Sequence, residues 1–274
     1  MNNLISRRRF LGTAAAAGAV SLGCSSGPAP DSAPAKRDFP IVDLHAHPND
    51  QVPISEQVEL ARQRGVKLGI LQHAGLAKYD YPHMISNDEL LNQWIATLEP
   101  YPVYKGIQAE GLEWPSCFSK HVLARLDYAL SDALTLPEPG GGFTKIWEPG
   151  LEIGDKQKWM DRYTDFHVEV MASEPIDILA NPLFLPEAIR GEFDELWTEK
   201  RMRTIIGAAV KYTVAIEINS RYQLPGEKFL RLARDAGAKF SFGSNRNGRQ
   251  VGTIEYSVAM ARKLKLTRAQ LFAP

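Results

Sequence analysis

The sequence predicts an α/β fold with parallel strands, arranged as a seven-stranded (β/α)7 barrel. Segments with the composition of strands alternate with segments of helical periodicity, which is typical of parallel sheets covered by helices. About 235 residues follow the N-terminal segment, enough for one domain of barrel size. The candidate strands span residues 41–46, 67–72, 102–108, 127–131, 176–180, 213–218 and 238–243.

Local signals indicate where helices begin and end between these strands. Ser86 with Glu89 three residues later has the pattern of a capping box, so a helix is expected to begin there. Gly65 and Gly237 follow helical segments, where a left-handed residue commonly ends a helix.

Two stretches have no clear periodicity, residues 111–126 and 132–160. The second contains Gly140, Gly141 and Gly142 in a row. Loops of this length inside a compact domain are usually functional or disordered, so we expect them to lie over one end of the barrel. The tryptophans in them, Trp114 and Trp147, could stack on a ligand, but packing is the more common outcome.

The first 24 residues have the pattern of an export signal. Residues 6–11, SRRRFL, resemble the twin-arginine motif, and the apolar run over 11–22 is too short to span a bilayer comfortably. The segment ends at Cys24 in a sequence that resembles a bacterial lipoprotein box, so Cys24 is the expected lipid anchor. Cleavage by the ordinary signal peptidase and release of a soluble protein is the alternative.

The expected organisation is therefore a twin-arginine-type lipoprotein signal over residues 1–24, a flexible tether over 25–38 and a barrel domain over 39–274. The tether, SSGPAPDSAPAKRD, is rich in Pro, Ser and Ala and has no apolar periodicity. This organisation predicts a periplasmic or extracellular protein, attached to a membrane only through the lipid at Cys24.

Charge and cysteine content narrow the expected partners. The 274 residues balance 32 basic against 32 acidic side chains, and without the three arginines of the signal the net charge is −3. Nothing in this balance suggests a nucleic-acid partner. With Cys24 lipidated only Cys117 remains, so no intramolecular disulfide can form, which suits export in the folded state.

The most informative motif is His45-Ala46-His47, at the end of an apolar run. Residues i and i+2 of a strand point to the same face, so these imidazoles can converge on one metal ion. Barrel active sites are assembled at the carboxyl ends of the strands, where this pair is expected to lie. The alternative is a chance pair of surface histidines.

The other predicted strands also end in polar residues. In chain order these ends read Gln72-His73, Gln108-Ala109-Glu110, Asn181-Pro182, Glu217-Ile218-Asn219 and Ser244-Asn245-Arg246-Asn247. With the His-x-His start, this series resembles the polymerase and histidinol phosphatase (PHP) superfamily over residues 40–273. The resemblance implies a distorted, TIM-like barrel of seven strands whose relatives hold two or three metal ions.

Compared with the family, this sequence keeps three histidine positions and lacks several others. His45, His47 and His73 match family ligands, although Gln72 stands where an aspartate is common. Other positions carry a different group from the family's ligand: Gln108 for glutamate, Asn181 for histidine, Asn245 for aspartate and Asn247 for histidine. Asp50 is the only polar candidate for a further ligand in the first loop.

These replacements remove negative charge or a good nitrogen donor while keeping a polar group. A multinuclear site is therefore not expected. His45, His47 and His73 with Glu110 would suffice for one divalent ion, zinc or manganese.

Neighbouring carboxylates then receive expected roles. Asp132 or Glu217 could take a proton during catalysis. Asp43, two residues before His45, could orient an imidazole.

The remaining candidates are less specific. Arg246 and Arg249 could bind a phosphate or carboxylate through two parallel hydrogen bonds, or lie idle on a solvated helix. His83, His121 and His167 fall in loop or helix segments, where a solvated or capping role is expected.

Two main function hypotheses follow. The first is an exported, PHP-like metal-dependent hydrolase with a mononuclear site, acting on a small and anionic substrate such as a phosphate ester. The second is a catalytically inactive relative that binds a small polar molecule in an amide-lined pocket. An amidohydrolase-type barrel is the weakest alternative, because no lysine stands at a strand end that matches that pattern.

Overall fold

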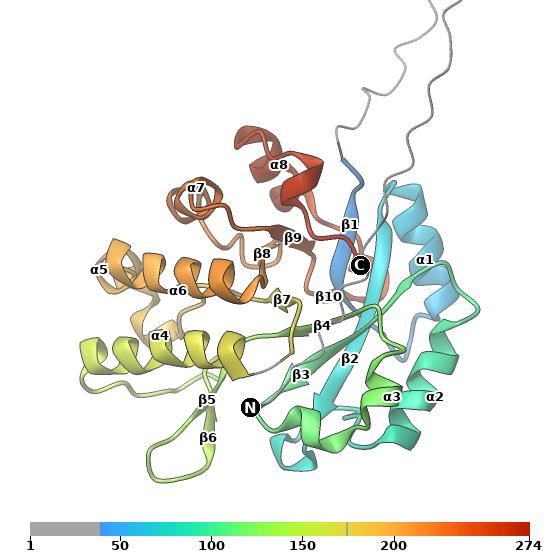
Figure 1. The fold of residues 1–274 in the computed structure, drawn as a ribbon, viewed down its shortest axis with the longest axis horizontal. Helices are drawn as coiled ribbons and strands as arrows, with labels where there is room; N and C mark the ends of the chain where they lie inside the picture. The colour runs from blue at the N-terminus through green and yellow to red at the C-terminus, as the bar shows by residue number, and fades with distance from the viewer. Residues whose placement is uncertain (1–38, 174) are drawn as a thin grey trace, which may run out of the picture. The chain divides into compact units, whose positions relative to one another are not determined.

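Eight parallel strands form one sheet in the residues that the computed structural model describes, 39–173 and 175–274. The order is β10-β1-β2-β3-β4-β7-β8-β9 (Figure 1). The strands are β1 (Val42–His47), β2 (Lys67–Gly75), β3 (Tyr104–Glu110), β4 (Tyr128–Ser131), β7 (Ile178–Leu179), β8 (Ala215–Asn219), β9 (Phe240–Gly243) and β10 (Arg246–Asn247). The predicted signal and tether, residues 1–38, lie outside the described residues.

The predicted count of seven strands is wrong by one. Seven strands coincide with the seven predicted segments, and the eighth, β10, is a two-residue strand. After β9, Ser244 and Asn245 turn the chain, and Arg246 and Asn247 then pair in parallel with Ala46 and His47 of β1. Asn245 adopts a left-handed backbone conformation with φ 49°. Asparagine tolerates this conformation better than most residues, so the turn suits its sequence.

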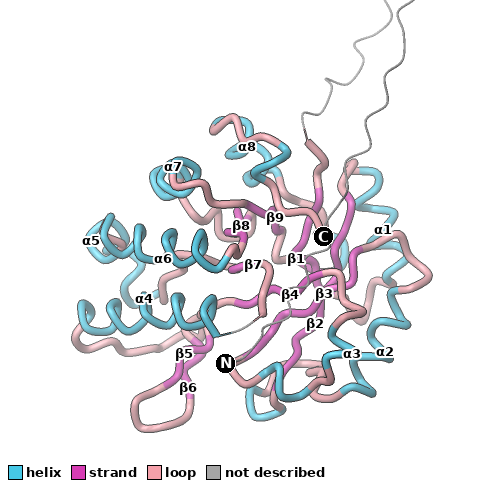
Figure 2. The backbone as a smooth tube through the Cα atoms, in the orientation of Figure 1, coloured by secondary structure: helices cyan, strands magenta, loops and turns pink. Residues whose placement is uncertain are grey.

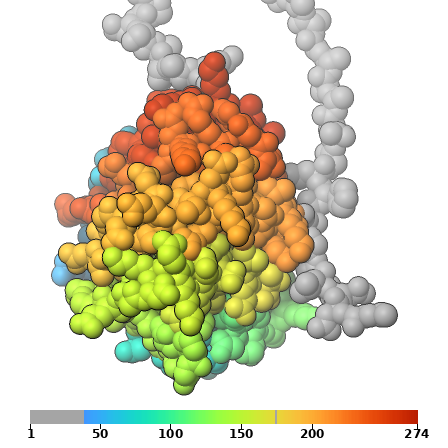
Figure 3. Space-filling view, turned by 90° about the vertical axis from the view of Figure 1, so that its left-hand side faces the viewer, coloured from blue at the N-terminus to red at the C-terminus, as the bar shows by residue number. Residues whose placement is uncertain are grey.

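Helices lie around the strands (Figures 1 and 2). The α-helices are α1 (Ile54–Gln63), α2 (Asp88–Leu98), α3 (Lys120–Leu123), α4 (Lys156–Ser173), α5 (Phe193–Leu196), α6 (Glu199–Tyr212), α7 (Glu227–Asp235) and α8 (Glu255–Lys263). Figure 3 shows the face on which the segments from α4 through α7 follow one another. None of the helices in the described residues is long and apolar enough to cross a bilayer.

Two of the three helix-end signals are confirmed. Gly65 and Gly237 have φ of 68° and 82° just after α1 and α7. The predicted capping box at Ser86 is wrong. With Ser86 as N-cap the helix would begin at residue 87, but α2 begins at Asp88. Asn87 is the N-cap, and its side chain accepts a hydrogen bond from the backbone N–H of Leu90.

The long stretch over 132–160 is more ordered than the sequence suggested. It contains an antiparallel hairpin, β5 (Thr135–Pro137) and β6 (Phe143–Lys145), and the start of α4. The other stretch, over 111–126, contains the 3-10 helix η2 (Trp114–Cys117) and α3. Trp114 is fully buried, as the packing interpretation expected.

The sheet curls so that β9 lies against β1 (Figure 2). The strands enclose a small apolar cluster that is separate from the main core between sheet and helices; it comprises Leu44, Leu71, Tyr128, Leu130, Ile178, Ala180 and Ala215. Gly106 makes room for the ring of Tyr128, since a Cβ on this glycine would lie 2.3 Å from Cζ of the tyrosine.

Asp43 of β1 bonds to residues that follow β9. No ladder of backbone hydrogen bonds joins β1 and β9 themselves in the described residues, whereas β10, just after β9, pairs with β1. The Asp43 carboxylate is fully buried. It accepts hydrogen bonds from the backbone N–H groups of His45 (3.1 Å), Ser244 (2.8 Å) and Gly252 (2.8 Å). Burial raises the pKa of this carboxyl, while the three donors oppose the rise. Asp43 therefore holds the ends of the sheet together and does not touch the imidazole it was expected to orient.

Replacing Asp43 by asparagine should destabilise the barrel, because one of the three backbone N–H groups would then face an amide NH2. Losing one such bond at a buried site costs about 1–3 kcal/mol. We expect urea titration to show this decrease in the free energy of unfolding. Asp165→Asn on the exposed face of α4 is the matched control and should stay within about 0.5 kcal/mol of wild type. An Asp43→Asn protein as stable as this control would contradict the role given to the carboxylate.

Candidate functional site

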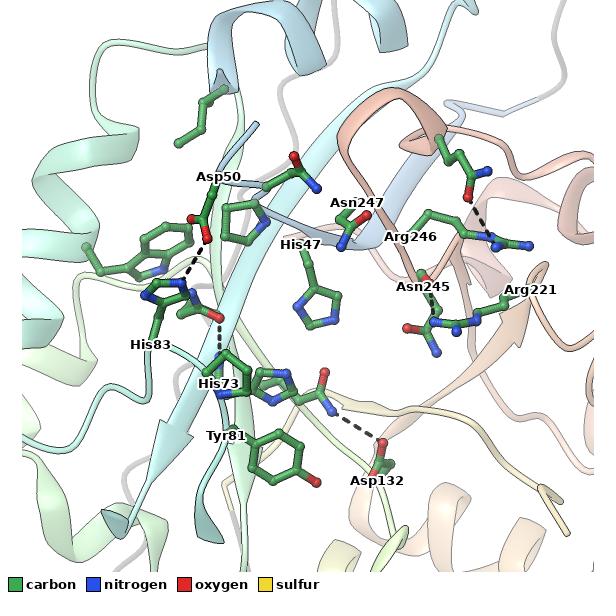
Figure 4. Close-up of a pocket in the computed structure, with 18 of the residues that line it drawn as sticks. His47, Asp50, His73, Tyr81, His83, Asp132, Arg221, Asn245, Arg246 and Asn247 are labelled. Carbon is green, nitrogen blue, oxygen red and sulfur yellow. Dashed lines mark hydrogen bonds and ion pairs between the residues drawn. The ribbon is translucent and has the colours of Figure 1, made fainter. Parts of the chain in front are cut away.

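A cavity of about 1000 Å³ opens at the carboxyl ends of the strands (Figure 4). This is the end at which barrel enzymes assemble their sites. Its walls come from seven or more separate segments, among them the ends of β1, β2, β3 and β10. The residues that matter below are His47, Gln72, His73, Tyr81, Gln108, Asp132, Trp147, Asn181, Arg221, Asn245, Arg246 and Asn247.

Three imidazoles lie next to one another at this end of the barrel. The ring centroids of His45 and His47 are 5.2 Å apart, and those of His47 and His73 are 5.1 Å apart. A register irregularity in the pairing of β1 with β2 falls between Asp43 and Ala46, and such bulges re-aim side chains. The three histidines predicted from the sequence to lie close together therefore do so in the structure.

His45 is held by Glu217. A hydrogen bond of 2.7 Å joins its Nδ1 to Oε1 of this carboxylate, and both side chains are buried. The carboxylate of Glu217 can occupy this position only because residue 243 is glycine. A Cβ on Gly243 would lie 1.8 Å from Oε1 of Glu217.

This pair favours the charged forms. Burial opposes charge on both groups, but the opposite charges and their hydrogen bond outweigh it. The pKa of His45 is therefore raised and that of Glu217 lowered. Glu217 also accepts bonds from the backbone N–H of Asn181 (2.8 Å) and from the amide of Asn219 (3.0 Å). With its oxygens occupied in this way, Glu217 orients His45, and its placement does not favour the proton-accepting role expected from sequence.

His73 is held by Glu110 in a similar way, again with 2.7 Å between Nδ1 and Oε1. Here burial dominates: it raises the pKa of Glu110 to about 8 and lowers that of His73 to about 4. Both shifts favour the uncharged forms. Glu110, expected to be a metal ligand, is instead placed as the carboxylate partner of His73.

His47 has no carboxylate partner of this kind. Its half-buried ring lines the cavity between the other two imidazoles. Burial, and then the neighbouring charges of His45 and His73, lower its pKa well below the usual value. His47 is therefore neutral around pH 7.

Several amide side chains at this end of the barrel form one hydrogen-bonded network with Asp132. Oδ1 of Asn181 accepts bonds from the amides of Asn219 (2.8 Å) and Asn245 (3.0 Å), and its Nδ2 donates to Asp132 (2.8 Å). Gln108 donates to the same carboxylate at 3.4 Å, while its own buried carbonyl oxygen has no partner. Asn181 has φ 46°, a left-handed conformation that suits asparagine. The network leaves Asn181 no spare acceptor for an ion.

Asp132 is the carboxylate of this network that lines the cavity. Burial, with a smaller contribution from the charge of Glu110, raises its pKa to about 7. A carboxyl with a pKa near neutrality can exchange a proton with a bound molecule. The proton-accepting role expected of Asp132 from the sequence stays a prediction.

Two guanidinium groups line the side of the cavity away from His73 (Figure 4). Arg246 donates to Gln250 (3.2 Å), and Arg221 donates to the backbone oxygen of Asn245 (3.4 Å). In the part of the chain that the structure describes, neither pairs with a carboxylate. Arg249, expected beside the substrate, lies outside the cavity, where its exposed side chain pairs with Glu56 (3.0 Å).

Other candidates are distributed around the cavity. Asn247 is exposed and lines it. Asp50 is also exposed and lies 3.4 Å from Nε2 of His83 at the rim, away from the three imidazoles. His121 is exposed, as expected.

His167 was expected to be solvated or capping, and this is wrong. It is fully buried in α4, and its Nδ1 bonds to the backbone oxygen of Tyr163 (2.8 Å).

Sequence reasoning missed Arg221 and Tyr81. Arg221 follows the polar end of β8 by two residues, so the rule used for the other strand ends would have found it. Tyr81 lies in an irregular segment between η1 (Ala77–Tyr79) and α2, where no local pattern indicates a role.

The residues present fit one divalent ion in their chemistry. Histidines that bind metals commonly hold a carboxylate through the other ring nitrogen, as His45 and His73 do. The rings pack against one another, however, and no three His, Cys, Asp or Glu side chains of the described residues are arranged to hold an ion. A multinuclear centre does not fit, because Asn245 donates to Asn181, and Asn181 and Gln108 donate to Asp132.

Comparison with solved structures identifies the fold. The structure of a histidinol phosphate phosphatase from Lactococcus lactis subsp. lactis Il1403, described as complexed with zinc, L-histidinol and phosphate, matches with a TM-score of 0.53. The two chains are 14% identical, and the match covers 82% of this chain and 92% of that one. At this identity the likeness shows a shared fold only.

Two other solved structures match less well. A HpcH/HpaI aldolase from Desulfitobacterium hafniense DCB-2 has a TM-score of 0.36 at 12% identity, covering 86% of this chain and 96% of that one. A mandelate racemase/muconate-lactonizing enzyme homologue from Roseovarius nubinhibens ISM has a TM-score of 0.33 at 11% identity. That match covers 76% of this chain and 54% of that one. Neither score is high enough to carry an argument.

No protein-family model and no curated protein matches the sequence. The fold therefore rests on the phosphatase comparison and on the strand order. Both support the predicted PHP-like, TIM-like barrel, with eight strands in place of seven.

Proposed function

We propose that this protein is a PHP-like hydrolase that acts on a small anionic substrate, a phosphate ester. His45, His47 and His73 would hold one divalent ion once their packed rings turn apart. One observation carries the proposal. Two imidazoles at neighbouring strand ends are each fixed through Nδ1 by a buried carboxylate, with a third imidazole between them. Such pairs orient ring nitrogens for a ligand.

The chain's own residues divide the remaining work. Arg221 and Arg246 would bind the anionic group, because a guanidinium forms paired hydrogen bonds with phosphate oxygens. Asp132 would accept or donate a proton at its carboxylate, while Glu217 and Glu110 keep the imidazoles in place. A bound zinc or manganese ion would supply a polarised water and a Lewis acid.

A second candidate function is the binding of a small polar molecule without catalysis. The Asn181-centred network favours it, because its buried amides satisfy one another and Asp132 without an ion. The unpartnered carbonyl oxygen of Gln108 would then accept a hydrogen bond from the ligand.

Metal content separates the two candidates. Protein stripped with a chelator should bind about one zinc or manganese ion and only then hydrolyse p-nitrophenyl phosphate. His47→Ala should abolish metal retention and lower kcat/KM by at least about 100-fold with little effect on the unfolding curve. His121→Ala, on the exposed surface of α3, is the matched control and should behave as wild type. Metal-free protein that binds phosphate but shows no metal-dependent hydrolysis would favour the second candidate.

The role of the guanidinium groups can be tested separately. Arg221→Gln should raise KM for p-nitrophenyl phosphate, and Kd for inorganic phosphate, by about 10-fold or more, since a hydrogen bond to a charged group contributes about 1.5–3 kcal/mol. Arg249→Gln removes an equal charge outside the cavity and should leave both constants unchanged. Equal effects of the two variants would indicate a general electrostatic effect and not a binding site.

The location remains a proposal from the sequence motifs. We propose export through the residue 6–11 motif and lipid attachment at Cys24. Wild-type protein should then fractionate with membranes, and Cys24→Ala should release it or leave it unprocessed, because stable anchoring requires several acyl chains. Unprocessed wild-type protein in the cytoplasmic fraction would argue against this.

A further inference from the structure

Tyr81 lies directly on one of the three imidazoles. Its ring stacks on His73 with a centroid distance of 4.2 Å and an interplanar angle of 20° (Figure 4). This is the shortest ring contact in the described residues. Asp80 and His83, on either side of Tyr81, have φ of 49° and 54°, so the backbone of this segment follows a defined, unusual path.

Three contacts from another part of the chain converge on the same tyrosine. The Tyr81 hydroxyl hydrogen-bonds Oγ1 of Thr135 in β5 (2.8 Å). Nζ of Lys145 in β6 lies 4.6 Å above the ring and also donates to the backbone oxygen of Asp80 (3.1 Å). The indole of Trp147, just after β6, is 5.8 Å away between centroids. The β5–β6 hairpin therefore contacts Tyr81 from three positions.

The bond to Glu110 alone does not fix the plane of the His73 ring. It holds one atom, Nδ1, whereas the χ2 torsion of histidine is broad and can vary about that contact. Stacking on both His47 and Tyr81, at 23° and 20°, restricts the plane. The position of Nε2 of His73, the atom left for a ligand, thus depends on its ring neighbours.

We propose that Tyr81 is a positioning residue that fixes the plane of the His73 imidazole, and that the β5–β6 hairpin acts on the site through it. The consequence for metal binding rests on the proposed function, whereas the effect on the ring does not. The hairpin is thereby part of the site's structure, through the contacts of Thr135 and Lys145 with Tyr81.

The effect on the ring is measured in the metal-free protein. In long-range ¹H–¹⁵N NMR spectra, wild-type His73 should show a single tautomer, and Tyr81→Leu should shift its ¹⁵N signals toward the tautomer average. Tyr81→Phe keeps the ring and removes the hydroxyl, which also hydrogen-bonds Glu110; because stacking fixes the plane, this variant should still show a single His73 tautomer. Tyr104→Leu is the matched control: Tyr104 also has a lysine over its ring, Nζ of Lys67 at 3.6 Å, but lies at the other end of the barrel. Unchanged His73 signals in Tyr81→Leu would overturn the proposal.

The link to the hairpin is measured by hydrogen exchange of backbone amides. Tyr81→Leu should increase exchange over residues 135–146, and Tyr104→Leu should not. Thr135→Val removes only the hydroxyl partner, and it supplies a milder variant if Tyr81→Leu fails to fold. Hairpin exchange at the wild-type rate in both Tyr81→Leu and Thr135→Val would overturn the coupling.

Zinc affinity separates this inference from the proposed function. If wild type binds zinc, Tyr81→Leu should weaken Kd by about 10-fold or more, the loss typical of residues that orient metal ligands, and Tyr81→Phe should stay within about twofold. Equal affinity of wild type and Tyr81→Leu would overturn the positioning role. If wild type binds no zinc, the proposed metal site fails, and the NMR and exchange results alone decide the role of Tyr81.

Discussion

The hydrogen bond between His45 and the buried carboxylate of Glu217 is the interaction on which the site depends most. It joins β1 to β8 across the carboxyl end of the barrel, and the same carboxylate holds the backbone of Asn181 after β7 and the amide of Asn219. A buried carboxylate without partners would be costly. The four strand ends around Glu217, including Gly243 of β9, therefore have to keep their relative positions.

The two carboxylate–imidazole pairs show how environment decides charge. Both have the same 2.7 Å geometry. For Glu217 the charge and hydrogen bond of His45, with further donors, outweigh burial and favour an ion pair, whereas for Glu110 burial outweighs its donors and favours the uncharged form. The same residue types therefore give one charged and one neutral pair within a single site.

The amide network organises the carboxyl end of the barrel through hydrogen bonds within the protein. Asn181 accepts two bonds and donates one, which leaves Asp132 as the carboxylate facing the cavity. Neutral amides carry a smaller desolvation cost than carboxylates or imidazolium groups in the same place. The network is thus satisfied largely within the protein, and two cations outside it, Arg221 and Arg246, line the same cavity.

The sequence by itself determined the strands and the polar residues at their ends. Apolar runs that stop at His45-Ala46-His47, His73 and Asn181 could be recognised because strand composition and its termination are local properties. The eighth strand could not be recognised, since two residues carry no periodicity and Arg246–Asn247 pairs only once β1 is in place. Tertiary structure also decided the roles within the site. Glu110 and Glu217 became partners of imidazoles, Arg249 turned to Glu56, and Arg221 and Tyr81 joined the cavity. Each depends on contacts between residues far apart in the chain, 172 positions for His45 and Glu217, which no local pattern encodes.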